Sequence, residues 1–263
     1  MRKPGQVFLV GAGPGDPELL TLKAVRMLGL AQAVVYDRLV SEEVLALAPP
    51  LARMIPVGKS PKSHPVPQEK INEILIDLAH DGLTVVRLKG GDPCIFGRGS
   101  EEAAALHAAG VPVEVAPGIT AAQGAAASTG VPLTHRGLAH SVRYVTGHCR
   151  DDLPLDLDWA GLADRDTTLV VYMGVANIAE VAVRLIEHGM PASLPVMAVA
   201  RATTPQERRL VTRLDRVAAD LAGSSLSGPT LFVIGQVVSL YHSCPAEVLA
   251  LLAMTPVCEV AYA

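Results

Sequence analysis

Aromatic side chains are scarce in this sequence of 263 residues, since three Phe, five Tyr and one Trp make up only 3% of it. Proteins that bind single-stranded nucleic acid usually stack bases on aromatic rings, and proteins that hold phosphate backbones are usually basic. Here the formal net charge is −4 and only 18% of the residues are charged. These shortages argue against nucleic acid as a partner.

Cysteines and long apolar runs are also few. The four cysteines have no spacing typical of a zinc ribbon or a disulfide scaffold, which favours reduced thiols in the cytoplasm. The apolar run 7–10 stops at Gly11 and is too short for the core of a signal peptide. The stretch 169–183 is interrupted by Asn177 and Glu180, and it is shorter than the roughly 20 residues that span a bilayer. The sequence therefore predicts a soluble, cytoplasmic protein that has no membrane partner.

Half of the residues are hydrophobic, which is enough for a well-buried core. In the first half of the chain, short β-branched runs alternate with helical patterns. The expected strands are 7–10, 33–37, 53–57, 84–88 and 113–115, and the expected helices include 18–30, one ending at Gly82, 100–109 and 119–128. Strands that alternate with helices predict parallel pairing and an α/β sandwich.

The second half repeats this alternation after a segment without periodicity, 130–139. Its expected strands are 142–146, 168–173, 196–199, 209–214 and 230–235, with helices at 177–188 and 214–222. We therefore predict two α/β domains in tandem, 1–133 and 142–263, joined by the linker 134–141. Small ligands bind at domain interfaces and at the carboxyl ends of parallel strands, so the active-site cleft is expected between the two domains.

The first candidate site is the turn Gly11-Ala-Gly-Pro-Gly-Asp16, which lies between a strand and a helix. Asp37 ends the next strand, where a ribose-binding carboxylate lies in dinucleotide-binding folds, so an oxidoreductase is one interpretation. Two residues disfavour it. Asp16 stands where that fingerprint needs a small residue, and Pro14 lacks a backbone donor for a phosphate.

Two further strand-to-helix turns concentrate unusual residues. The first, 87–102, has four glycines within ten residues, and these allow the backbone to approach a ligand closely. Its Asp92 can accept hydrogen bonds, and its Arg98 can form a bidentate pair with a carboxylate. The second, 115–124, places Thr120 in the first turn of a helix rich in small residues. A structural role, such as capping a loop or packing a helix closely, explains individual residues in these turns. It does not explain why so many glycines and charged residues occur together.

Taken in order, the motifs of this chain resemble those of the uroporphyrinogen-III C-methyltransferases over roughly residues 5–242. The motifs are Gly11–Asp16, Tyr36–Ser41, Gly58-Lys59, Val86–Pro93, Phe96–Gly99, Pro117–Ala121, Pro132–Arg136, Val145–His148 and Tyr172–Gly174. The Gly-Ala-Gly-Pro-Gly-Asp and Gly-Gly-Asp-Pro turns belong to the wider tetrapyrrole methylase superfamily. The resemblance implies the tetrapyrrole methylase fold and a homodimer.

The resemblance also implies the reaction. Methyl groups pass from S-adenosylmethionine to C2 and then C7 of uroporphyrinogen III, which gives precorrin-2 through precorrin-1 and leaves S-adenosylhomocysteine. Such an in-line displacement depends on positioning and needs no metal, while the proton lost from the pyrrole requires a nearby base. The product serves sirohaem, cobalamin or haem d1 synthesis, and the sequence does not distinguish these pathways.

By this resemblance, residues of this chain receive roles. S-adenosylmethionine is expected to contact Pro14, Gly90, Gly91, Asp92, Ile95, Thr120, Ala121, Met173 and, where the family has a glycine, Ala202. The expected proton acceptor is Asp37 and the expected donor is Lys59. The substrate carries several carboxylates, so a net-acidic protein must gather cations locally. The expected substrate contacts are Arg38, Arg98, Glu101 and Arg136, in which Arg98 also takes part in catalysis and Glu101 holds its guanidinium.

Two alternatives stay open at this point. One is another superfamily member that methylates a later corrin precursor, a ribosomal RNA or the diphthamide precursor. The other, from a different class, is the dinucleotide-binding oxidoreductase. Some family members are fused to a dehydrogenase/chelatase module, which is not expected here because the first strand begins by Val7.

Overall fold

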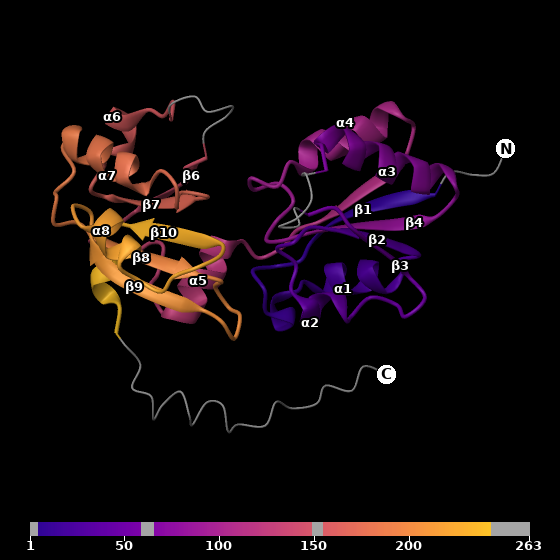
Figure 1. Ribbon diagram of the computed structural model, residues 1–263, viewed down its shortest axis with the longest axis horizontal. Helices are drawn as coiled ribbons and strands as arrows, with labels where there is room; N and C mark the ends of the chain where they lie inside the picture. The colour runs from indigo at the N-terminus through magenta and orange to yellow at the C-terminus, as the bar shows by residue number, and fades with distance from the viewer. Residues whose placement is uncertain (1–4, 59–65, 149–154, 243–263) are drawn as a thin grey trace, which may run out of the picture.

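The computed structural model describes residues 5–58, 66–148 and 155–242. Within these residues the chain forms two five-stranded sheets, each covered by helices. The sheets lie in two lobes beside each other, with the N-terminal strands in one lobe and the later strands in the other (Figure 1). The two-lobed α/β fold predicted from the sequence is confirmed.

The first sheet is entirely parallel, in the order β3-β2-β4-β1-β5. Its strands are β1 (Gln6–Gly11), β2 (Ala33–Tyr36), β3 (Arg53–Pro56), β4 (Thr84–Lys89) and β5 (Val113–Ala116). In the central pair, Val7 lies opposite Val85 and Gly11 lies opposite Lys89. Helices on both faces bury these strands, which explains their nearly continuous apolar runs.

Two layers of helices cover the first sheet. They are η1 (Pro17–Leu19), α1 (Leu22–Gly29), α2 (Glu42–Leu45), α3 (Gln68–His80) and α4 (Gly99–Ala108). Helices α1 and α2 pack on one face, and α3 and α4 pack on the other. Ile71, Leu75 and Leu78 of α3 point into the core because their spacing places them on one side of the helix. The Ser41 side chain caps α2 by accepting a hydrogen bond from Val44 N.

The second sheet is mixed, in the order β6-β7-β10-β8-β9. Its strands are β6 (Ser141–Thr146), β7 (Thr167–Tyr172), β8 (Pro195–Ala200), β9 (Arg208–Arg213) and β10 (Thr230–Ile234). Parallel pairing, expected from the alternation of strands and helices, holds for β6 and β7 but is wrong for β10 and β9. The loop 201–207 is too short for a parallel crossover, so β8 and β9 pair as an antiparallel hairpin.

The helices of the second lobe form two layers as well. Helices α6 (Trp159–Leu162), α7 (Ile178–Glu187) and α8 (Val217–Ala222) cover one face, and α5 (Ala121–Thr129) and η2 (Gln236–Leu240) cover the other. Helix α5 precedes the segment predicted as the linker, yet its Ala122 and Ala125 pack on the second sheet (Figure 1). The domain limits themselves remain a prediction. None of the helices described here has the length and apolar character needed to cross a membrane.

Candidate active site

Three glycine-containing turns meet at the carboxyl ends of β1, β4 and β5. Gly13 and Gly91 form a bridge of two backbone hydrogen bonds, 2.7 Å from Gly91 N to Gly13 O and 3.2 Å in the reverse direction. A Cβ at position 118 would lie 2.2 Å from the Gly91 carbonyl oxygen, so the turns touch through their backbones. The carboxylate of Asp92 accepts hydrogen bonds from Gly118 N at 2.9 Å and Cys94 N at 2.8 Å. Asp92 thus ties the second turn to the third.

The second lobe adds the loop after β8 to this junction. A Cβ at Gly15 would lie 3.5 Å from the carbonyl oxygen of Ala202, and Pro14 packs so closely on α5 that a Cβ at Gly124 would lie 2.6 Å from its Cγ. Pro14 and Ala202, both predicted to contact S-adenosylmethionine, therefore lie at the same junction, although 188 positions separate them in the numbering.

The start of α5 and the end of β7 complete the junction. Thr120 caps α5 by accepting a hydrogen bond from Gln123 N, and Ala122 N donates to the Tyr172 hydroxyl at 3.2 Å. Burial raises the pKa of Tyr172, which keeps this hydroxyl neutral. Met173 follows directly and is half exposed. The predicted contacts Thr120 and Met173 are thus held near each other by Tyr172.

The turn at Gly91 has space for a ligand. Its φ is +69°, and a Cβ there would meet no heavy atom closer than Ala121 N at 4.0 Å. The side chains of Ile95 and Met173 are 37% and 51% exposed. Ligand sites combine apolar walls with a few placed polar backbone groups. The residues at this junction therefore fit S-adenosylmethionine, which has an amino-acid end and a purine.

Backbone strain is concentrated around the same junction. In the described residues, left-handed φ values at positions other than glycine occur at Phe96, Arg98, Met173, Arg201 and Thr203. All five lie on the loops that follow β4, β7 and β8. Such conformations cost about 1–3 kcal/mol each and cluster at functional sites. These left-handed conformations were not predicted from the sequence, because Phe, Arg, Met and Thr are not typical of left-handed backbone positions.

Asp37, the expected proton acceptor, lies at the end of β2 above a buried group of charges. Its Oδ1 accepts a hydrogen bond from Arg87 Nη2 at 2.7 Å, and Lys89 Nζ lies 3.8 Å from its Oδ2. Both cations also contact Glu102 Oε1, at 3.1 Å from Arg87 Nε and 2.9 Å from Lys89 Nζ. Burial, followed by the Arg87 charge, lowers the pKa of Lys89. None of these three partners was assigned a role from the sequence, although Arg87 and Lys89 lie two residues apart in a largely apolar strand.

The expected substrate contacts are exposed. Arg98 and Glu101 form the expected ion pair, with distances of 2.9 Å from Nε to Oε1 and 2.6 Å from Nη2 to Oε2. The hydrogen bond to Glu101 raises the pKa of Arg98, which stays a permanent cation. Arg38 follows Asp37 and is exposed beside Gly58, and Arg136 is exposed on the turn 135–139. Lys59, the expected donor, lies outside the described residues.

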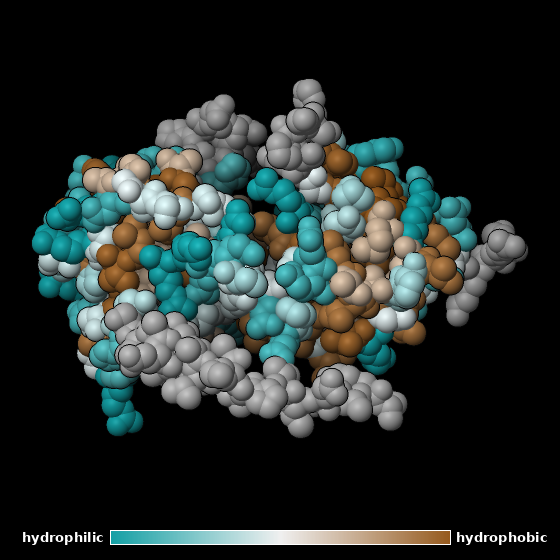
Figure 2. All heavy atoms as spheres, turned by 60° about the horizontal axis from the view of Figure 1, so that its bottom comes forward, coloured by the Kyte–Doolittle hydropathy of each residue, from teal (hydrophilic) through white to brown (hydrophobic). Residues whose placement is uncertain are grey.

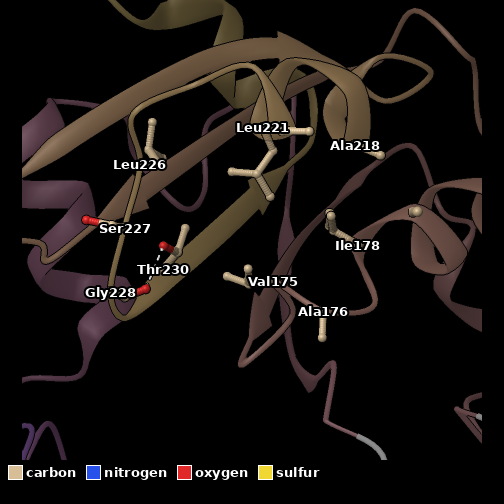
Figure 3. A pocket seen from close by; sticks show the side chains of 11 residues that line it. Val175, Ala176, Ile178, Ala218, Leu221, Leu226, Ser227, Gly228 and Thr230 are labelled. Carbon is tan, nitrogen blue, oxygen red and sulfur yellow. Dashed lines mark hydrogen bonds between the residues drawn. The ribbon is translucent and has the colours of Figure 1, made fainter. Parts of the chain in front are cut away.

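Figure 2 shows that the molecular surface is hollowed between the two lobes. A separate hollow of about 390 Å³ lies within the second lobe, between α7, α8 and the loop that leads to β10. Val175, Ile178, Leu221 and Thr230 line it (Figure 3). None of the predicted site residues that the structure describes lines this hollow, so it is distinct from the junction. Across the described segments, no cluster of three or more His, Cys, Asp or Glu residues suits a metal ion.

The chain is similar in sequence to known proteins over most of its length. The family model of the tetrapyrrole (corrin/porphyrin) methylases matches residues 6–218. The chain is 60% identical over 240 residues to a uroporphyrinogen-III C-methyltransferase of Paracoccus denitrificans, which covers 91% of this chain and 84% of that protein. It is 50% identical over 236 residues to a siroheme synthase of Acinetobacter baylyi, covering 90% of this chain but only 51% of that longer protein.

A solved structure is also similar. It is the uroporphyrin-III C-methyl transferase of Thermus thermophilus complexed with S-adenyl homocysteine, which is 46% identical to this chain. The TM-score is 0.78, and the match covers 90% of this chain and all of that one.

Proposed function

The chain belongs to the tetrapyrrole (corrin/porphyrin) methylases, and from this membership we propose that it methylates uroporphyrinogen III with S-adenosylmethionine as the donor. We further propose C2 and then C7 as the acceptor carbons, with precorrin-2 as the product. The observation that supports this function best is the junction of three glycine turns with the start of α5 and the loops after β7 and β8. It combines an open backbone turn at Gly91 with exposed apolar side chains.

The residues at the junction would hold the methyl donor. We propose Gly90, Gly91, Asp92 and Ile95 from the second glycine turn and Thr120 and Ala121 from the start of α5, with Pro14, Met173 and Ala202 completing the set. S-adenosylmethionine supplies a methyl group on a sulfonium, which is already activated for transfer. The task of these residues is therefore to orient the donor and to exclude water, because positioning provides most of the rate of such a displacement.

The charged residues would bind the substrate and take its proton. Arg98, held by Glu101, presents a guanidinium that suits the carboxylates of the tetrapyrrole, and Arg38 and Arg136 are the other proposed contacts. Asp37 is 28% exposed, so its carboxylate can reach a bound molecule while its inner edge stays paired with Arg87. We propose that Asp37 accepts the proton lost after methyl transfer and that Lys59 is the donor.

The function is tested by incubating the purified protein with uroporphyrinogen III and S-adenosylmethionine. The oxidised product is then examined by absorbance and mass spectrometry. A gain of two methyl groups is expected, with loss of turnover in the Asp37→Asn variant. No gain would refute the assignment, and methylation of a later corrin precursor alone would favour another member of the family.

Only methyl transfer is proposed, because the chain spans about half of the siroheme synthase that it matches. We also propose a cytoplasmic homodimer, as the sequence resemblance implies. Sedimentation analysis should then give twice the 27.5 kDa mass of the chain.

A further inference from the structure

A closed group of buried charges lies beneath Asp37, and we define it as the Arg87–Lys89–Glu102 cluster. The side chains of Arg87, Lys89 and Glu102 are 2%, 4% and 0% exposed. Arg87 and Lys89 come from β4, while Glu102 reaches them from the first turn of α4. Gln68 of α3 also donates to Glu102 Oε1, at 3.1 Å, so this single oxygen accepts three hydrogen bonds.

A buried cluster of this kind is weak evidence for a role in stability. Burying charges costs several kcal/mol per ion, and an ion pair in the interior is often no better than well-packed apolar residues. Here the cost is increased, because the buried Glu102 Oε2 has no hydrogen-bond partner in the described part of the chain. Burial and the Arg87 charge lower the pKa of Lys89, and the carboxylates of Glu102 and Asp37 act in the opposite direction. Such an arrangement is typical of a functional site.

We propose that the Arg87–Lys89–Glu102 cluster positions the Asp37 carboxylate and places the charges of Arg87 and Lys89 beside it, so that it can accept the proton of the substrate. This inference rests on the proposed function, in which Asp37 is the acceptor. Arg87 orients Oδ1 at 2.7 Å, and Lys89 adds a second positive charge at 3.8 Å from Oδ2. The hydrogen bond from Asp37 N to Leu88 O, 3.4 Å, fixes the backbone on β4. These are positioning residues, since they act through Asp37.

The positive and negative charges of this group are equal in number, so removing one charge of either sign should have opposite effects on Asp37. Arg87 and Lys89 supply two positive charges, and Glu102 and Asp37 supply two negative ones. Among the described residues, these are the charged groups that β4 and α4 place around Asp37. Removing the Lys89 charge leaves an excess of negative charge, which favours protonation of Asp37. Removing the Glu102 charge leaves an excess of positive charge, which opposes it.

The experiment measures the pH dependence of kcat/KM for uroporphyrinogen III in Lys89→Met and Glu102→Gln. In Lys89→Met the acid limb should move to higher pH by about one unit or more, with activity recovering as the pH rises. In Glu102→Gln the limb should move to lower pH. Lys70→Met is the control, because Lys70 forms an exposed pair with Glu73 on α3. A purely structural role would lower kcat at all pH values without moving the limb.

A second measurement needs no substrate. The carboxyl carbon of Asp37, assigned by its loss in Asp37→Asn, is titrated by ¹³C NMR in the same variants. Opposite displacements in Lys89→Met and Glu102→Gln support the inference, and the isosteric Glu102→Gln tests it even where Lys89→Met does not fold. Unchanged titration in a folded variant overturns it. If the carboxyl titration moves but the acid limb does not, the role of Asp37 in the proposed function fails instead.

Discussion

Arg98 and Arg184 form the same local contact, since each pairs with a glutamate three residues later on an exposed helix. Exposed pairs of this kind contribute at most about 1 kcal/mol to stability. Arg98 differs in its position, because it directly precedes α4. It has a φ of +57° and lies on the strained loop that carries Phe96. Arg184 lies in the last turn of α7. The comparison separates a guanidinium available to a ligand from one that is held 5.8 Å from the centroid of the Trp159 ring.

We therefore expect Arg98→Ala to lower kcat/KM for uroporphyrinogen III by about tenfold or more, since a charge-assisted hydrogen bond contributes about 1.5–3 kcal/mol. The affinity for S-adenosylhomocysteine, measured by calorimetry, should change little. Arg184→Ala removes an equivalent pair and should leave both quantities near the wild-type values. Full turnover of Arg98→Ala at limiting substrate would contradict the assignment of Arg98 to the substrate.

Asp220 offers a residue-scale test of electrostatics away from the junction. The Thr212 hydroxyl donates to its carboxylate and, with Arg216, lowers the pKa of Asp220. A lowered folded-state pKa gives stability that is present above the ordinary value of 3.8 and is lost as the pH falls. Thr212→Val should raise the pKa of Asp220, and ¹³C NMR measures it. Thr230→Val, which removes a hydroxyl that donates to Gly228 O, should leave that pKa unmoved.

At the scale of elements, the sequence predicted most helices and strands because local patterns determine them. The apolar spacing in α3 and the capping serine of α2 depend on neighbours a few residues away. The antiparallel hairpin of β8 and β9 was not predicted, since periodicity does not encode which strands pair. The contact of turns at Gly11, Gly91 and Gly118 was anticipated only as three separate motifs. In the structure these turns pack against one another through their backbones at the ends of β1, β4 and β5.

This packing predicts that two glycine-to-alanine substitutions change the free energy of unfolding in opposite directions. In Gly118→Ala, the new Cβ would collide with the Gly91 carbonyl and should lower the free energy of unfolding by about 1–3 kcal/mol. In Gly29→Ala, the Cβ meets no atom within 4 Å, and alanine in α1 should raise it by about 0.5–1 kcal/mol. Urea unfolding measures both. Equal effects of the two substitutions would show that the turns are not closely packed.

In the whole molecule, the two lobes contact each other through residues that are far apart in the sequence. Asp16 N donates to Thr203 Oγ1 at 3.2 Å, and the rings of Phe96 and Tyr172 lie 5.1 Å apart between centroids. Within the second lobe, Arg209 Nη2 of β9 donates to Ser128 O of α5 at 2.7 Å. A ligand that touches loops of both lobes would strengthen their association, because it binds only the folded arrangement.

S-Adenosylhomocysteine should consequently raise the melting temperature of the whole protein. At a concentration 100 times its Kd, the stabilisation is about 2.7 kcal/mol, which corresponds to about 5–10 °C for a chain of this size. Scanning calorimetry with NAD provides the control. A comparable shift with NAD, and none with S-adenosylhomocysteine, would instead favour the interpretation of the first glycine turn as a dinucleotide-binding turn.

Residue types at short spacing are enough to predict most of the elements, the glycine turns and the family resemblance. Three features follow only from the tertiary structure. They are the antiparallel pairing of β10 and β9, the packing of α5 on the second sheet, and the position of Glu102 beneath Asp37. These depend on which surfaces meet after the chain has crossed long distances. The buried ion cluster is an example. Arg87 and Lys89 are visible in the sequence as two charges in a largely apolar strand, but no local pattern pairs them with Glu102, which lies 15 and 13 positions further along the chain.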